Sequence, residues 1–324
     1  MLLGFDIGGT KCAVILGKAG DENDTIHIVE KEVTPTNRTA YQMIDLLFTM
    51  AESILLKHAV TDKELQGIGI SCGGPLNSTT GIVLSPPNLP GWDNIPIVEL
   101  TKKRFNKNAL LQNDANACAI AEWKYGAGKG YKNLIFLTFG TGMGAGLILN
   151  GKLYSGTTDL AGEVGHIRLA EMGPVGFGKA GSFEGYCSGG GIAQLAQIKV
   201  RQQLQMGEKV SFCKSLNELP DLTAKLVAEA AYKGDKVAID IYKTCAEFLG
   251  RGLAILIDII NPELIILGSI YSRARSLIEP HMRKTLEEEA ITTSYKNCLI
   301  VSPGLSENIG DMAALALARE SMFV

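Results

Sequence analysis

A carboxylate at a strand-to-helix junction is the side chain of this sequence best suited to move a proton. The segment QNDANA, residues 112–117, places Asn113 and Asp114 between an apolar strand and an alanine-rich helix. An aspartate there can take the proton of an attacking hydroxyl in phosphoryl transfer. The positive end of the helix should favour its charged form. Aspartate is also a favoured helix N-cap, and this structural role is compatible with the chemical one.

Two glycine-rich turns have the composition of anion-binding loops. Residues 2–16, LLGFDIGGTKCAVIL, and 134–149, LIFLTFGTGMGAGLIL, each predict a strand, a turn and a second strand. Glycines let backbone amides approach phosphate oxygens closely, and Asp6 could hold Mg²⁺ through water. No helix follows either turn, so neither is a Walker A loop or a dinucleotide fingerprint. Two ordinary glycine hairpins are the alternative interpretation.

Several polar residues in loops could match the hydroxyls of a ligand. Glu163 and His166 stand three apart in AGEVGH, Glu184 lies in SFEG, and Asn88 lies in PPNLPGW. A buried polyhydroxylated ligand needs such amide, carboxylate and imidazole partners, although each residue could instead serve only its own loop. Gly268 and Ser269 end another predicted strand, where they could border the base or ribose of a nucleotide.

The composition indicates a well-packed α/β protein without a nucleic-acid footprint. Of the 324 residues, 46% are hydrophobic, and 31 basic against 34 acidic residues give a net charge of −3. Nucleic-acid binding would need clustered basic residues. No apolar run is long enough to span a bilayer, and the start of the chain does not read as a signal peptide. Seven scattered cysteines favour reduced thiols in a cytoplasmic protein.

Alternating strands and helices predict two α/β halves. We expect helices at 40–58, 97–106, 115–125, 190–205, 221–232, 235–258, 274–289 and 308–319. Besides the strands around the glycine turns, we expect strands at 67–71, 109–112, 263–267 and 298–302.

In combination, these motifs resemble the ROK family, which contains bacterial sugar kinases and related repressors. DIGGTK, NDANA, GTGMGAG, AGEVGH and SFEGYCSG occur in the order and spacing of that family over nearly the whole chain. The resemblance implies two actin-like (ribonuclease H-like) α/β domains around ATP and a sugar. The expected domains are a small one at 1–117, rejoined by a C-terminal helix at about 305–324, and a large one at 118–304.

The resemblance also implies roles for individual residues. Asp114 corresponds to the family's catalytic base. The family's sugar-binding residues correspond to Asn88, Asn113, Asp114, Glu163, His166 and Glu184. The nucleotide-binding positions correspond to Asp6, Gly8, Gly9, Thr10, Lys11, Gly140, Thr141, Gly142, Gly144, Gly268 and Ser269.

The segment 165–191 departs from the family pattern. Relatives carry a histidine and three cysteines that hold a structural zinc, and here the three cysteine positions are Val175, Phe177 and Ser182. Cys187 lies beyond the pattern, so a four-ligand zinc site is not expected. We expect apolar packing of Val175, Phe177 and Phe183 to shape this loop instead.

The expected activity is therefore an ATP- and Mg²⁺-dependent hexose kinase acting on the 6-hydroxyl, with glucose as first choice of acceptor. N-acetylmannosamine, N-acetylglucosamine, mannose and fructose are alternative acceptors, and the resemblance implies a homodimer. A sugar-responsive repressor is the alternative from another class, but the first glycine strand begins within a few residues and no basic segment is apparent. A sugar-binding protein that has lost catalysis is a third interpretation, which the intact Asp114 disfavours.

Overall fold

The computed structural model describes residues 1–20 and 25–323. The chain divides into two compact units. The first comprises Met1–Phe136, Gly146–Ala161 and Pro303–Val324, and the second comprises Leu137–Ala145 and Gly162–Ser302. Residues 21–24 of the expected first domain and Val324 of the expected returning segment lie outside the described residues.

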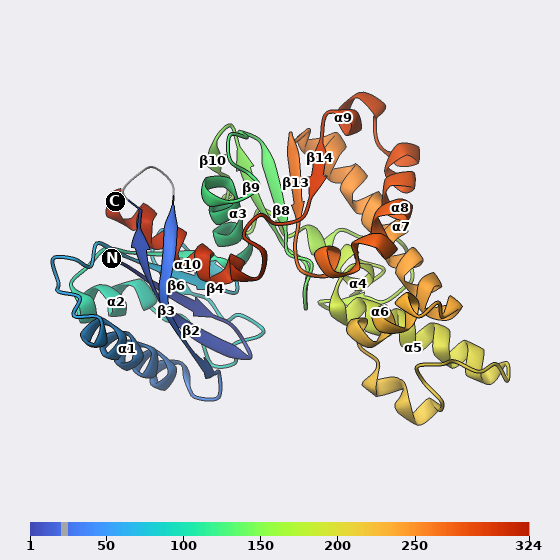
Figure 1. The fold of residues 1–324 in the computed structure, drawn as a ribbon, viewed down its shortest axis with the longest axis horizontal. Helices are drawn as coiled ribbons and strands as arrows, with labels where there is room; N and C mark the ends of the chain where they lie inside the picture. The colour runs from blue at the N-terminus through green and yellow to red at the C-terminus, as the bar shows by residue number, and fades with distance from the viewer. Residues whose placement is uncertain (21–24, 324) are drawn as a thin grey trace. The chain divides into compact units, whose positions relative to one another are not determined.

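A five-stranded mixed sheet organises the first unit. Its order is β3-β2-β1-β4-β7, with β1 antiparallel to β2 but parallel to β4, and β4 parallel to β7. The strands are β1 (Leu2–Ile7), β2 (Lys11–Ala19), β3 (Ile26–Pro35), β4 (Gly67–Cys72) and β7 (Ala109–Asn113). Because β1, β4 and β7 run parallel, their carboxyl ends meet at one edge of the sheet. Figure 1 labels β2, β3 and β4 of this sheet.

Apolar side chains on one side of this sheet form a core with two helices. Leu3, Phe5 and Ile7 alternate along β1 and join Phe48 of α1 (Ala40–Lys57) in one buried cluster. The ring of Phe5 lies edge-on to that of Phe48, with ring centres 5.9 Å apart. α2 (Ile97–Phe105) adds Phe105, whose ring centre is 5.3 Å from that of Phe48. The alternation matches the two-residue period of a strand.

Glycines in the adjacent strands β1 and β4 let the C-terminal helix α10 (Ile309–Glu320) approach the sheet closely. An added Cβ at Gly69 of β4 would lie 2.0 Å from the Ala314 oxygen, and one at Gly4 of β1 would lie 2.9 Å from the Ala314 Cβ. Gly4 and Gly69 are paired in register. These small positions admit the helix backbone where any side chain would hold it away.

A buried glutamate ties the C-terminal segment to α3 (Asp114–Tyr125) within the first unit. Glu122 is fully buried, and its Oε2 accepts hydrogen bonds from the Ala127 amide at 2.8 Å and the Gly304 amide at 3.0 Å. Its Oε1 accepts from the Leu305 amide at 2.9 Å. The chain passes from the second unit into the first between Ser302 and Pro303, so Glu122 fixes the first residues after this passage.

A second five-stranded sheet has the order β10-β9-β8-β13-β14. Its strands are β8 (Leu134–Leu137), β9 (Ala145–Leu149), β10 (Lys152–Leu153), β13 (Leu264–Leu267) and β14 (Leu299–Val301). The α-helices of the second unit are α4 (Phe183–Tyr186), α5 (Gly189–Gln205), α6 (Ala224–Tyr232), α7 (Lys236–Ile260), α8 (Ile270–Glu289) and α9 (Thr292–Lys296). α7 packs along α8 and also contacts α5 and α6.

The predicted α/β class is confirmed, and each predicted helix corresponds to a helix of the structure with shifted ends. Elements not expected from the sequence are β3, β10, α4, α9 and the short strand pairs β5 (Leu76–Asn77) with β6 (Ile82–Val83) and β11 (Val175–Gly176) with β12 (Lys179–Ala180). Among the described residues, no helix has both the length and the apolar content to cross a bilayer.

Candidate active site

Asp114 lies where β7 passes into α3, at the carboxyl edge of the first sheet. Asn113 is the N-cap, because its Oδ1 accepts a hydrogen bond from the Ala115 amide at 2.9 Å. Asp114 Oδ1 accepts from the same amide at 2.8 Å. The capping role therefore belongs chiefly to Asn113, and Asp114 is the first helical residue.

The surroundings of Asp114 raise its pKa rather than lower it. Solvent reaches the side chain, yet desolvation by the surrounding protein outweighs the lowering effect of its backbone hydrogen bonds. The expectation that the helix terminus would dominate and favour the charged form is thus wrong in direction. A raised pKa brings the carboxylate closer to the working pH, which suits a group that accepts a proton.

Asp6 is the second carboxylate at this edge, at the end of β1. Desolvation, followed by the negative charges of Asp114 and Asp311, raises the pKa of Asp6 to about 6. Asp311, on the first turn of α10, forms an ion pair with Lys31 of β3 at 2.6 Å. The edge therefore concentrates negative charge that a bound cation would stabilise.

The first glycine turn lies beside Asn88. The Gly8 amide donates to the Lys11 oxygen at 3.1 Å, which closes the turn between β1 and β2 and leaves Thr10 and Lys11 exposed. An added Cβ at Gly9 would lie 2.3 Å from the Asn88 carbonyl oxygen. The close approach of the two backbones thus requires glycine at position 9.

Asn88 and Asn113 also approach a common pair of glycines. A Cβ added at Gly73 would lie 3.1 Å from the side-chain amide atoms of Asn88, and one added at Gly74 would lie 2.9 Å from the Asn113 Nδ2. The structure therefore gathers the first-unit residues of the predicted site at one edge of one sheet. They are Asp6, Gly8, Gly9, Thr10, Lys11, Asn88, Asn113 and Asp114.

The second glycine turn is held by Thr138 and joined to Glu184. The Thr138 hydroxyl accepts a hydrogen bond from the Gly144 amide at 2.8 Å. Glu184 Oε2 accepts from the Met143 amide at 3.0 Å, and a Cβ at Gly142 would lie 2.9 Å from the same oxygen. A predicted sugar ligand and a predicted phosphate turn are therefore in direct contact within the second unit. Local sequence patterns do not indicate this contact, because 41 residues separate Met143 from Glu184.

The segment around His166 is built from short elements. A 3₁₀ turn, η1 (Val164–His166), follows Glu163, whose carbonyl oxygen accepts from the His166 amide at 3.2 Å. The Glu163 side chain is exposed and that of His166 is half-buried. Ser182 caps α4 by accepting from the Gly185 amide at 3.1 Å, which orients the helix that carries Glu184.

The expectation of apolar packing in this loop is confirmed for Phe183 and wrong for two residues. Phe183 is fully buried, and its ring lies so close to α7 that a Cβ at Gly252 would be 2.3 Å from it. Val175 and Phe177 are 47% and 63% exposed, because the β11–β12 ribbon that carries them lies at the surface. Among the described residues, no group of three or more His, Cys, Asp or Glu side chains is placed to hold a metal ion.

A cavity of about 910 Å³ lies in the second unit beside the second glycine turn. Its walls include the predicted residues Gly140, Thr141 and Ser269. Ser269 adopts a φ of +29°, an uncommon conformation for a residue with a side chain. The Ile270 amide following it donates to the Phe139 oxygen at 2.9 Å, which fixes the loop against the end of β8. The size is typical of a small-molecule pocket.

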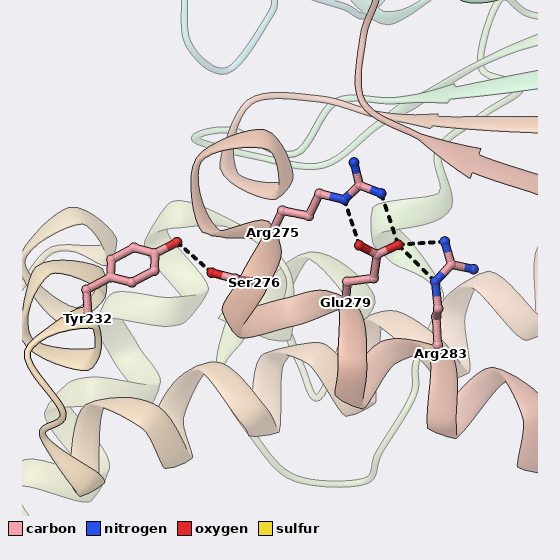
Figure 2. A network of polar contacts seen from close by, with 5 residues as sticks. All are labelled: Tyr232, Arg275, Ser276, Glu279 and Arg283. Atoms are coloured by element: carbon pink, nitrogen blue, oxygen red, sulfur yellow. Dashed lines mark hydrogen bonds and ion pairs between the residues drawn. The ribbon is translucent and has the colours of Figure 1, made fainter.

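One wall of this cavity, formed by α6 and the start of α8, was not expected from the sequence. Tyr232 lines the cavity, and its hydroxyl donates to the Arg273 oxygen at 3.0 Å. Figure 2 shows the Tyr232 hydroxyl directed toward Ser276 of α8. One turn further along α8, Glu279 bonds both Arg275 and Arg283, and these interactions lower the pKa of Glu279 to about 2. The network begins one residue after Ala274, whose φ and ψ depart from the helical values.

A family model, curated proteins and solved structures all match this chain over nearly its full length. The family model described as ROK family matches residues 2–321. The glucokinase of Streptomyces coelicolor is 31% identical over 99% of this chain and 98% of its own length. The crystal structure of a ROK family glucokinase from Streptomyces griseus in complex with glucose and AMPPNP is 29% identical, with a TM-score of 0.75 over 98% of this chain and 99% of that one. The xylose repressor of Caldicellulosiruptor bescii is 27% identical over 99% of this chain and 78% of its own length.

Proposed function

The chain belongs to the ROK family, and we propose that it transfers the γ-phosphate of ATP to the 6-hydroxyl of a hexose, with glucose as the preferred acceptor. It is an ATP-dependent sugar kinase, with glucokinases among its chain-long relatives. The observation that carries the proposed chemistry is Asp114, a carboxylate of raised pKa at the N-terminus of α3.

The residues of the first unit supply the proton transfer. Asp114 accepts the proton of the 6-hydroxyl as that oxygen attacks the γ-phosphate in line. Asn113 fixes the start of α3 and so orients the backbone of Asp114. Asn88 and Asn113 offer amide groups to the remaining sugar hydroxyls, since each buried hydroxyl needs a partner.

The residues of the second unit supply the other contacts. Glu163, His166 and Glu184 bind sugar hydroxyls, and the amides of Thr141 and Gly142 in the second glycine turn bind phosphate oxygens. The 910 Å³ cavity receives the adenosine, with Ser269 and Tyr232 in its walls. Gly268 supports this wall, because its amide donates to the Leu137 oxygen at 2.9 Å.

Asp6 fits the role of a magnesium-binding carboxylate. Desolvation and then the charges of Asp114 and Asp311 raise the pKa of Asp6 to about 6, so its negative charge is unfavourable without a cation. Mg²⁺ is commonly held by one or two carboxylates together with water and phosphate oxygens. Bound Mg²⁺ neutralises charge on the transferred phosphoryl group. Gly9 and Thr10, in the turn that the Gly8–Lys11 hydrogen bond closes, then offer amides to the same phosphates.

The test is ADP release with glucose, mannose, fructose, N-acetylglucosamine and N-acetylmannosamine, comparing wild type with Asp114→Asn. Asp114→Asn is expected to lose about 10²- to 10⁴-fold in kcat because general-base catalysis contributes on that scale. Asp62→Asn, at an exposed position, is the matched control and should keep full activity. 6-Deoxyglucose should not accept phosphate. Near-full turnover by Asp114→Asn would show that the assignment of the base is wrong. A higher kcat/KM for another sugar would show that this sugar, and not glucose, is the preferred acceptor.

A further inference from the structure

An exposed aromatic ring lies against the imidazole of His166. The ring centres of Phe177 and His166 are 5.0 Å apart and the two planes meet at 82°, an edge-on arrangement. Aromatic pairs prefer this geometry. Phe177 follows β11 and precedes β12, so the turn of the ribbon brings the ring to the histidine.

Packing of Phe177 itself does not explain its position. The residue is 63% exposed and has a φ of +43°, a backbone region that residues with side chains rarely adopt. The φ of its neighbour Gly178 is also positive. A large apolar side chain in an unfavourable conformation at the surface gains little from burial, which leaves the contact with His166 as its evident interaction.

The same ribbon also holds the backbone of His166. Lys179 of β12 donates from Nζ to the His166 carbonyl oxygen at 2.7 Å. The next residue along the chain is tied as well, since the Phe183 amide donates to the Ile167 oxygen at 2.8 Å. The ribbon thus contacts the main chain of His166 through Lys179 and its imidazole through Phe177.

We propose that Phe177 is a positioning residue that fixes the imidazole of His166 in the rotamer that receives the sugar. This inference rests on the proposed function, in which His166 binds a sugar hydroxyl. Restricting a side chain before binding lowers the entropy cost of forming the complex. Edge-on aromatic pairs have coupling energies that correspond to about 3- to 10-fold in a dissociation constant.

The test is a double-mutant cycle on glucose binding measured by calorimetry. Phe177→Leu is expected to raise the Kd for glucose about 3- to 10-fold and to leave the Kd for ATP unchanged. Phe177→Tyr, which keeps the ring, should restore the wild-type Kd. Met172→Ala is the matched control, since Met172 is 82% exposed in the same segment, and it should bind glucose as the wild type does.

The variant His166→Ala distinguishes a failure of the positioning role of Phe177 from a failure of the proposed sugar site. If Phe177 acts through His166, Phe177→Leu adds nothing in the His166→Ala background. An equal loss in both backgrounds would show that Phe177 touches the sugar directly and would overturn the positioning role. A wild-type Kd in Phe177→Leu, with a weakened His166→Ala, would overturn this inference alone. Unchanged glucose binding by His166→Ala would overturn the proposed sugar site and the inference with it.

Discussion

Replacing the buried Glu122 should destabilise the first unit more than any single surface change. Its carboxylate accepts three backbone hydrogen bonds, from Ala127, Gly304 and Leu305, and is fully buried. In Glu122→Gln only one side-chain oxygen can accept, so at least one amide faces an NH₂ group. A hydrogen bond to a charged group is worth about 1.5–3 kcal/mol, and we expect a loss of about 2–4 kcal/mol. Glu122→Ala leaves all three amides without this acceptor and should cost about 3–6 kcal/mol.

Tryptophan fluorescence measures this loss selectively. The chain has two tryptophans, Trp92 and Trp123, and both belong to the first unit. Urea unfolding followed by their emission therefore reports on the unit that Glu122 stabilises. Glu99→Gln, at an exposed position on α2, is the control and should change stability by less than about 0.5 kcal/mol. If the unfolding transition of Glu122→Gln coincided with that of the wild type, the reasoning would be refuted. The three hydrogen bonds would then stabilise the folded protein no more than water stabilises the same groups in the unfolded chain.

Three further predictions concern pH and packing. Because the folded pKa of Asp6 is raised from 3.8 to about 6, its charge opposes folding above that pH. Asp6→Asn should therefore gain about 1–3 kcal/mol at pH 7–8 over wild type, and urea titrations without metal should show the gain vanish as pH falls from 6 to below 4. Glu279, whose pKa is lowered from 4.5 to about 2, stabilises the fold above pH 4.5 and loses this effect as pH falls toward 2. Glu279→Gln should cost about 1 kcal/mol at pH 7 in thermal unfolding, a value reduced for solvent screening, and nothing near pH 2. Gly69→Ala should lower the unfolding free energy by about 1–3 kcal/mol, since its Cβ would lie 2.0 Å from the Ala314 oxygen, whereas Gly190→Ala, at an exposed position where a Cβ would meet nothing nearer than 3.9 Å, should have a smaller effect.

The parts of the fold predicted from sequence are those with strong local periodicity. Apolar runs on both sides of DIGGTK predict β1 and β2, and they pair antiparallel as expected. β3 escaped detection because only Ile26 of its ten residues is buried and the charged run Glu30, Lys31 and Glu32 interrupts its apolar residues. The closeness of α10 to the sheet depends on Gly4 and Gly69 being paired across strands, a relation between distant residues that local patterns do not contain.

The candidate site shows the same division. Asp114 and the two glycine turns occupy strand ends, where the alternation of strands and helices predicts them. Tyr232 was missed because it ends an ordinary amphipathic helix, and only the packing of α6 beside α8 brings it to the cavity. The predicted direction of the shift in the pKa of Asp114 was wrong. A helix terminus can be predicted from the sequence, whereas desolvation depends on the surrounding fold.

In the proposed site, the hydrogen bond between Glu184 and the Met143 amide links sugar binding thermodynamically to nucleotide binding. One carboxylate oxygen already holds the second glycine turn, at 3.0 Å from the amide, and the same carboxylate is a proposed sugar ligand. A sugar hydroxyl that donates to Glu184 changes the strength of the hydrogen bond between Glu184 and the Met143 amide. A phosphate that orders the turn changes the position of the Glu184 carboxylate that binds the sugar. Linkage requires the two effects to be equal, so the factor by which glucose changes the affinity for nucleotide must be the factor by which nucleotide changes the affinity for glucose.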